Sequence, residues 1–244
     1  MLFNLMCEGV TLRGAARILR CAKKTVERKF EFVAVQSRVR HKTAIANGEF
    51  RTDLVSMDEM ETYELTKLKP LSITLAVTEG GLIVETQVAE MKCKGHLAYL
   101  SATKYGLRVD ERKEACRKTL RQVASVLASS ADVFTIKTDK KTAYVTLIAE
   151  ELPGVRHEQY HRKVKALYGT HVQNKRDAPY GFHTNGKPLD PMFMLNQRCA
   201  KIRSQLSRMR RRFWGATKSR YRLTRHLWIF TAWQNKYEQK LDYC

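Results

Sequence analysis

Two aspartates stand in apolar, strand-like segments of this chain, each near the polar end. Asp58 lies in the run 53–60, which reads Asp-Leu-Val-Ser-Met-Asp-Glu-Met, and Asp139 ends the run 132–139, which reads Asp-Val-Phe-Thr-Ile-Lys-Thr-Asp. Two Mg²⁺ ions held about 3.5–4 Å apart by carboxylates stabilise both the attacking and the leaving oxygen in phosphodiester chemistry. We therefore interpret Asp58 as the carboxylate that bridges two metal ions and Asp139 as a ligand of one of them. Glu59 is a weaker ligand, because a regular pleat turns it to the opposite face of its strand.

The charge of the chain points to a polyanionic partner. The 244 residues include 45 Lys and Arg against 24 Asp and Glu, a net charge of +21. A surface this basic binds nucleic acid through phosphate contacts and counterion release. A basic surface that surrounds a small group of carboxylates is typical of an enzyme that acts on nucleic acid.

Composition also bears on the compartment. The six cysteines are scattered with no C-x-x-C pair, which favours reduced thiols over a disulfide framework or a zinc site. No apolar run approaches the ~20 residues of a membrane span. The N-terminus lacks the basic region of a signal peptide. We therefore expect a cytoplasmic protein with no membrane partner.

The first 48 residues are predicted to form a helical DNA-binding segment. Thr11 can cap a second helix, and a short turn at 20–22 leads to a third helix that begins near Lys23. A helix, a short turn and a basic helix follow each other in a helix-turn-helix. The alternative is a three-helix cluster whose charges are merely solvated. The residues expected to contact DNA are Lys23, Lys24, Thr25, Arg28 and Lys29.

The hydrophobic pattern changes to a period of two after a predicted connector at 41–48, which indicates strands. The predicted strands cover 53–60, 71–77, 82–89, 133–138 and 143–149, with a helix at 110–129 between the third and the fourth. Three strands, a helix and another strand, followed by further helices, is the element order of an RNase H-like fold. This order predicts an α/β domain over 49–244, with a mixed five-stranded sheet flanked by helices and its first and fourth strands close together.

The C-terminal third is predicted to be a loop followed by two helices. Residues 153–190 are polar and rich in His, Asn, Gly and Pro, and Pro191 is suited to begin a long helix. One apolar stripe follows this helix through Leu195, Cys199, Ile202, Leu206, Met209 and Phe213. A closing helix is expected at 221–239, and the three tryptophans are expected in the core.

The residues around these sites resemble a family of bacterial insertion-sequence transposases, which are DDE-type enzymes with an RNase H-like core. The resemblance covers nearly the whole chain and is most specific in its first and third catalytic blocks. The first block is matched by 57–63 with 66–72, and the second by 136–140 with Tyr144. The third block is matched by 195–203 with Arg208, 211–214, Thr217 and Lys218. The helix-turn-helix is matched by 9–19 with 24–26 and 28–29.

The resemblance implies a DNA transposase that cleaves strands at the ends of its element and joins the freed 3′-hydroxyl to target DNA. It implies Mg²⁺ as cofactor, with Mn²⁺ as substitute. The partners are double-stranded DNA, as transposon ends and as target, and at least one further copy of the chain. The implied location is the bacterial cytoplasm, at the nucleoid. The basic C-terminal helix is expected to follow the DNA backbone through Arg203, Arg208, Arg211 and Arg212.

The third metal ligand departs from the family pattern. A DDE enzyme places a glutamate on the C-terminal helix, and residues 191–218 contain no Glu. Asn196 is the natural substitute, because related transposases carry Asn there and its carbonyl oxygen can bind Mg²⁺. Arg203 lies two helical turns further on the same face, where it could contact a phosphate. Glu158 is the competing third ligand, in the segment predicted to be a loop.

Two other functions fit parts of the pattern. A catalytically inactive, transposase-derived DNA-binding protein is consistent with the missing glutamate and with Met1 standing inside the first helix, where related chains carry a zinc ribbon upstream. The presence of both Asp58 and Asp139 opposes it, because a binding protein does not need the pair. An RNA-directed nuclease of the same fold would use both acids and would leave the helix-turn-helix without a role.

Overall fold

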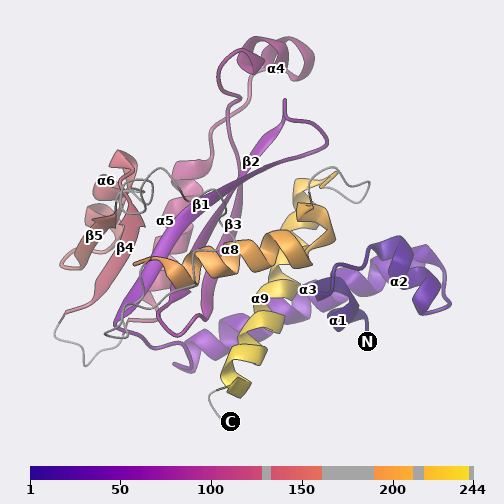
Figure 1. Cartoon of the computed structure of the whole chain (residues 1–244), viewed down its shortest axis with the longest axis horizontal. Coiled ribbons are helices and arrows are strands. Elements are labelled where there is room, and N and C mark those ends of the chain that lie inside the picture. Colours follow the sequence, from indigo (N-terminus) through magenta and orange to yellow (C-terminus); the bar gives the residue numbers. More distant parts are fainter. Residues whose placement is uncertain (128–132, 161–189, 211–216, 242–244) are drawn as a thin grey trace, which may run out of the picture.

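A mixed five-stranded sheet forms the centre of the molecule (Figure 1). The computed structural model describes residues 1–127, 133–160, 190–210 and 217–241. The strand order is β3-β2-β1-β4-β5. The strands are β1 (Leu54–Tyr63), β2 (Pro70–Thr78), β3 (Ile83–Glu90), β4 (Thr135–Asp139) and β5 (Arg156–Tyr160). The first three form an antiparallel meander, and β4 and β5 continue the sheet parallel to β1.

Helices cover both faces of this sheet. They are α1 (Leu2–Cys7), α2 (Leu12–Ile18), α3 (Lys23–Ala46), α4 (Leu97–Tyr105), α5 (Arg112–Ala124), α6 (Thr142–Glu151), α8 (Phe193–Gln205), the 3₁₀ turn η1 (Ser207–Met209) and α9 (Arg220–Leu241). The predicted α/β class with a mixed five-stranded sheet is confirmed. Within the described part of the chain, no helix combines the length and apolar character needed to cross a membrane.

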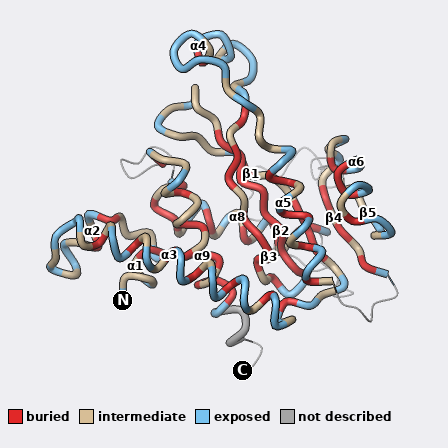
Figure 2. The backbone as a smooth tube through the Cα atoms, turned by 180° about the vertical axis from the view of Figure 1, so that it is seen from behind, coloured by how far each residue is buried: buried red, intermediate tan, exposed pale blue. Residues whose placement is uncertain are grey.

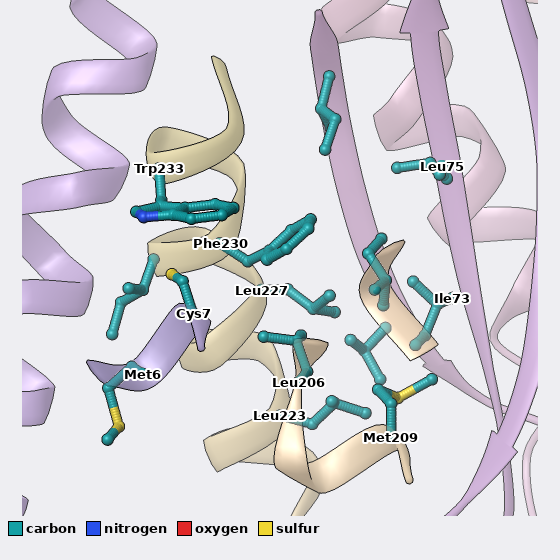
Figure 3. Packing of buried hydrophobic residues seen from close by; sticks show 14 of the residues in the cluster. Met6, Cys7, Ile73, Leu75, Leu206, Met209, Leu223, Leu227, Phe230 and Trp233 are labelled. Carbon is teal, nitrogen blue, oxygen red and sulfur yellow. The ribbon is translucent and has the colours of Figure 1, made fainter. Parts of the chain in front are cut away.

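Two buried clusters lie on opposite faces of the sheet. One joins β1 and β4 to α5 and α6, and the other joins β1, β2 and β3 to α8, α9 and the N-terminal helices. Figure 3 shows the second cluster, in which Leu227 and Phe230 of α9 and Leu206 pack toward Ile73 and Leu75 of β2. Most residues of the central strands are therefore buried, as the red colour of these strands in Figure 2 shows. Helices α1 to α3 share this core with α9. The division of the chain into two domains after residue 48 stays a prediction.

The N-terminal helices begin where the sequence predicts. The side-chain oxygen of Thr11 accepts a hydrogen bond from the backbone N–H of Gly14 at 3.0 Å and caps α2. Helix α3 begins at Lys23 but continues to Ala46, so the predicted connector at 41–48 is wrong. The reason is tertiary packing, since His41 is buried and its Nε2 is hydrogen-bonded to the carbonyl of Val84 in β3 at 2.9 Å.

The segment 143–149 is a helix, and its prediction as the fifth strand is wrong. In α6 the buried residues are Tyr144, Leu147 and Ile148, which have helical spacing. The fifth strand is β5, inside the region predicted to be a loop; residues 161–189 of that region lie outside the described residues. Parallel neighbours such as β4 and β5 need a crossover connection, and α6 supplies it.

The predicted C-terminal stripe is buried, but the helix that carries it is broken. Leu195, Ile202 and Leu206 are buried as expected, whereas Phe213 lies outside the described residues. Leu206 has φ −82° and ψ 116°, so α8 ends at Gln205 and a 3₁₀ turn follows. The closing helix is confirmed as α9.

Candidate active site

Asp58 and Asp139 occupy neighbouring strands at the same level. The parallel pairing of β1 with β4 includes Ser56 opposite Lys137. Asp58 and Asp139 each lie two residues beyond this pair, so continuing the register places them side by side. Neighbouring strands are about 4.8 Å apart, which is close enough for two carboxylates to share a metal ion.

Both aspartates point to the α8 face of the sheet. Met60, two residues after Asp58, is buried in the cluster that contains Leu195 and Ile202 of α8. Ile136, three residues before Asp139, is buried in the cluster on the opposite face. Because side chains alternate along a strand, Asp58 shares the face of Met60 and Asp139 faces away from that of Ile136. Helix α8 crosses this face in Figure 1.

Cys199 shows which part of α8 lies nearest the aspartates. Burial raises the pKa of the Cys199 thiol to about 11, the positive charge of Arg203 opposes this rise, and the carboxylate of Asp58 adds to it. These charges act on the thiol only at short range. Helix α8 also packs directly against β1 and β2, so Cys199 and Arg203 lie on the part of α8 that faces this end of the site.

Asn196 lies one turn before Cys199 and is exposed. Its Nδ2 donates to Oδ2 of Asp190 at 2.6 Å, and Oδ1 of Asp190 accepts from the backbone N–H of Met192 at 2.9 Å. Asp190 was not predicted as part of the site, although an acid just before a helix start is a recognisable capping signal. The carbonyl oxygen of Asn196, which is the metal-binding atom of an amide, takes no part in this hydrogen bond.

Glu59 has a structural partner on the opposite face, as its strand position predicts. Its Oε2 forms an ion pair with Nζ of Lys141, and its Oε1 accepts from Sγ of Cys116 at 3.5 Å. The backbone N–H of Glu59 donates to Oδ1 of Asp58 at 2.7 Å. Since Lys141 follows Asp139 by two residues, the Glu59–Lys141 pair joins the middle of β1, next to Asp58, to the chain just beyond the end of β4.

Tyr144 lies close to these carboxylates. Burial raises the pKa of the Tyr144 hydroxyl, and the charges of Glu59, Cys116, Asp58 and Asp139 raise it further. The Tyr144 hydroxyl and Oδ1 of Asp139 are buried and have no hydrogen-bond partner within the described part of the chain. Buried polar atoms are nearly always satisfied, so Oδ1 of Asp139 is an atom that a bound cation could satisfy, whereas Tyr144 packs in the cluster behind the sheet.

The residues present fit a Mg²⁺ site of few protein ligands. Among the described residues, no group of three or more His, Cys, Asp or Glu side chains could hold a metal ion. Mg²⁺ prefers hard oxygen ligands and keeps several of its waters, so one or two carboxylates suffice. Asp58 and Asp139 would supply these carboxylates, with the amide oxygen of Asn196 as the predicted third ligand.

Glu158, the competing third ligand, is already engaged. It lies in β5 and not in the predicted loop. In the sheet it stands opposite Lys137 of β4. Its Oε2 accepts from the hydroxyl of Tyr160 at 2.6 Å, and its Oε1 forms an ion pair with Arg156 at 3.0 Å. Binding a metal ion through these oxygens would disturb both contacts, and Asn196 remains the predicted third ligand.

The predicted DNA-contact residues of α3 lie on its first two turns. Lys23, Lys24, Arg28 and Lys29 are exposed and Thr25 is partly buried. Lys23 forms an ion pair with Glu27 at 3.0 Å, which leaves the other three as the freer cations. Exposed arginines on α2 and in the turn after it were not predicted and enlarge this basic surface: Arg13, Arg17 and Arg20.

The predicted DNA contacts in the C-terminal region are divided between surface and core. Arg203 is exposed. Arg208 packs with its Cζ 5.8 Å from the centre of the Phe30 ring, and burial lowers its pKa to about 10. Its guanidinium therefore lies within the helical layer, away from the surface expected for a DNA contact. Arg211 and Arg212 lie outside the described residues.

Comparison of the chain with protein-family models and with curated proteins finds no match.

Proposed function

We propose that this chain is a metal-dependent DNA transposase of the DDE type, with an RNase H-like core and an N-terminal helix-turn-helix. The observation that carries the proposal is the placement of Asp58 and Asp139 at one level of the parallel β1–β4 pair. In an RNase H-like sheet, the first and fourth strands are the ones that bring catalytic acids together. The strand order β3-β2-β1-β4-β5 and the net charge of +21 support the same conclusion.

Each residue has a defined task in this proposal. Asp58 and Asp139 hold the cations, and the amide oxygen of Asn196 completes the ligand set from α8. When bound, Mg²⁺ supplies the positive charge that activates water or a 3′-hydroxyl and stabilises the leaving oxygen. Arg203 contacts a phosphate beside the scissile bond. On the opposite face of the sheet, the Glu59–Lys141 ion pair connects β1 to the chain just after β4. It thereby stabilises the alignment of Asp58 with Asp139.

DNA reaches the site through basic surfaces. Lys24, Arg28 and Lys29 on α3 contact the ends of the element in a groove or along its backbone. Transposition joins two ends, so two or more copies of the chain act together on DNA. The chain works in the cytoplasm of a bacterial cell, at the nucleoid.

A catalytically inactive DNA-binding protein derived from such an enzyme is the second candidate. The specific observation in its favour is that residues 191–218 contain no Glu and that the amide of Asn196 is bonded to Asp190. This arrangement weakens the third ligand. It leaves the Asp58–Asp139 pair unexplained, so we rank it second.

Strand cleavage and joining on a labelled duplex tests the proposal. The duplex carries the DNA that flanks the coding sequence of this chain, and reactions contain Mg²⁺, Mn²⁺ or EDTA. We expect metal-dependent nicking and joining that Asp58→Asn abolishes and that Asp53→Asn, an exposed acid on the same approach to β1, leaves intact. End binding without cleavage in either metal would overturn the catalytic proposal and leave the DNA-binding alternative.

A further inference from the structure

One part of the chain projects from the body of the molecule and contributes no residue to either buried cluster. It consists of residues 64–69, which link β1 to β2, and residues 92–109, which include α4; we call it the knob. Figures 1 and 2 both show α4 standing away from the sheet, with mostly exposed backbone around it. Only Ser101 of α4 is buried. The helix was not predicted from sequence, because it lacks a buried face that would impose a periodic pattern.

The knob is held in a fixed position despite its exposure. Oγ of Ser101 donates to the carbonyl of Leu68 at 2.7 Å, which ties α4 to the β1–β2 link. At the base, Arg108 donates to the carbonyls of Met91 at 3.3 Å and Pro70 at 3.2 Å. These hydrogen bonds connect the two segments of the knob to each other and to the ends of β2 and β3, so the knob has a fixed orientation relative to the sheet.

That surface exposes an unusual set of apolar and aromatic side chains. Leu107 is 94% exposed and Tyr99 is 77% exposed. Further exposed apolar residues of the knob are Leu65, Leu100, Tyr105 and Val109. Clustered exposure of this kind marks interaction sites rather than ordinary surface.

The charge of the same surface is positive. Lys67, Lys92 and Lys104 are exposed and form no ion pair with any described residue. Glu64, the one acid within these two segments, forms an ion pair with Lys69 at 3.0 Å, and the acids at the base are paired as well, Glu61 with Lys94 at 2.9 Å and Glu90 with Arg108 at 3.4 Å. The knob therefore offers three uncompensated ammonium groups between aromatic and aliphatic side chains.

We propose that the knob is a second DNA-binding surface, which holds the duplex that leads to the Asp58–Asp139 site; this inference rests on the proposed function. Lysines contact phosphates, and exposed Tyr and Leu side chains pack against bases or sugars, a combination typical of nucleic-acid grooves. A second copy of the chain fits less well, because each copy carries +21 and both knobs are positive.

The position of the knob agrees with this role. It begins after Tyr63, at the end of β1, five residues beyond Asp58. At about 3.3 Å per residue, the strand covers roughly 17 Å between them. At about 3.4 Å per base pair, a duplex that followed the direction of β1 from the site would reach the base of the knob after roughly five base pairs.

Salt-dependent binding to a generic 30-base-pair duplex, in EDTA so that catalysis plays no part, tests the lysines. The variant is Lys67→Ala/Lys92→Ala/Lys104→Ala. Its control, Arg40→Ala/Arg51→Ala/Lys118→Ala, removes the same charge from exposed positions elsewhere. At about 0.9 per phosphate contact, we expect the slope of log K against log salt to fall by roughly 2 to 3 in the knob variant, with at least tenfold weaker binding. The control variant should stay within about threefold of the unmodified chain.

A charge-neutral variant, Tyr99→Ala/Leu107→Ala, tests the apolar part. We expect roughly tenfold weaker duplex binding with an unchanged salt slope, because apolar contacts in the groove are lost and phosphate contacts remain. Equal behaviour of both knob variants and the control would overturn the inference while leaving DNA binding by the unmodified chain in place. Failure of the unmodified chain to bind duplex would overturn the proposed function as well. If sedimentation instead shows that Tyr99→Ala/Leu107→Ala dissociates a dimer and leaves duplex binding intact, the knob is an interface between copies and the inference is wrong.

Discussion

Asp58 and Asp139 are 81 positions apart in sequence, and each lies two residues beyond the Ser56–Lys137 pair of parallel strands. Their alignment depends on the register of β4 against β1, which is fixed by Val55 and Ile136 in the buried cluster behind the sheet. A slip of one residue would turn one carboxylate to the other face. The core therefore determines whether the site exists.

The identity of the third ligand can be decided with two single variants. Asn196→Ala removes the amide oxygen, and we expect at least a tenfold loss of metal-dependent cleavage, comparable to losses at other weakened metal sites. Glu158→Ala should retain nearly full activity, because that carboxylate already serves Tyr160 and Arg156. Cleavage rates at several Mn²⁺ concentrations measure both effects. Loss of activity in Glu158→Ala with retention in Asn196→Ala would reverse the assignment.

The β2–β3 turn supports α8 through one glycine. Gly81 has φ +85°, its carbonyl accepts from Nε of buried Arg198 at 2.7 Å, and an added methyl would collide with Arg198 and with Met194. We expect Gly81→Ala to lower the free energy of unfolding by about 2–4 kcal/mol, from backbone strain and the displaced arginine. Urea unfolding measures this.

The neighbouring glycine provides the matched control for that experiment. A methyl at Gly80 would come no closer than 4.0 Å to Thr78 Oγ1, and Gly80 does not have the positive φ of Gly81. Gly80→Ala should therefore change the free energy of unfolding by under about 1 kcal/mol. Equal destabilisation by both substitutions would mean that the contact with Arg198 does not support the turn.

Stability is expected to fall in weak acid because of His226. This residue is buried and its Nε2 is hydrogen-bonded to the carbonyl of Met6 at 2.7 Å. Burial, aided by the charge of Arg208, lowers the pKa of His226 from 6.5 to about 4. Between these values the unfolded chain binds a proton that the folded chain does not, so stability decreases as pH falls from about 6.5 to about 4. The total loss amounts to roughly 3 kcal/mol.

A non-titrating variant separates this effect from the other titrating groups. His226→Gln keeps a donor for the carbonyl of Met6 and cannot be protonated. Urea midpoints measured at pH 7, 6, 5 and 4.5 should decrease less in the variant than in the unmodified chain. Parallel decreases in both proteins would show that His226 is not responsible.

Local signals predicted the elements that depend on local chemistry. The Thr11 cap of α2 and the start of α3 at Lys23, after a short turn, were both predicted from the residues at those positions. The strand around Asp58 was also predicted, because its apolar residues Val55 and Met57 alternate in the sequence and both are buried on the face of α5 and α6.

The errors arose where tertiary contacts override local preference. The β-branched and aromatic run 143–149 favours a strand, yet it forms α6 because β4 and β5 are parallel and need a crossover. The break at Leu206 leaves the apolar stripe intact, so periodicity alone could not reveal it. The burial of Arg198 was also unpredictable, since arginine is rarely fully buried.

Binding of Mn²⁺, measured by electron paramagnetic resonance with and without a short duplex, tests the central claim most directly. The account predicts that the unmodified chain binds Mn²⁺, that Asp58→Asn and Asp139→Asn each weaken binding at least tenfold, and that Asp53→Asn does not. Equal Mn²⁺ affinity in all four proteins, or no binding by the unmodified chain with duplex present, would contradict a metal site built by Asp58 and Asp139.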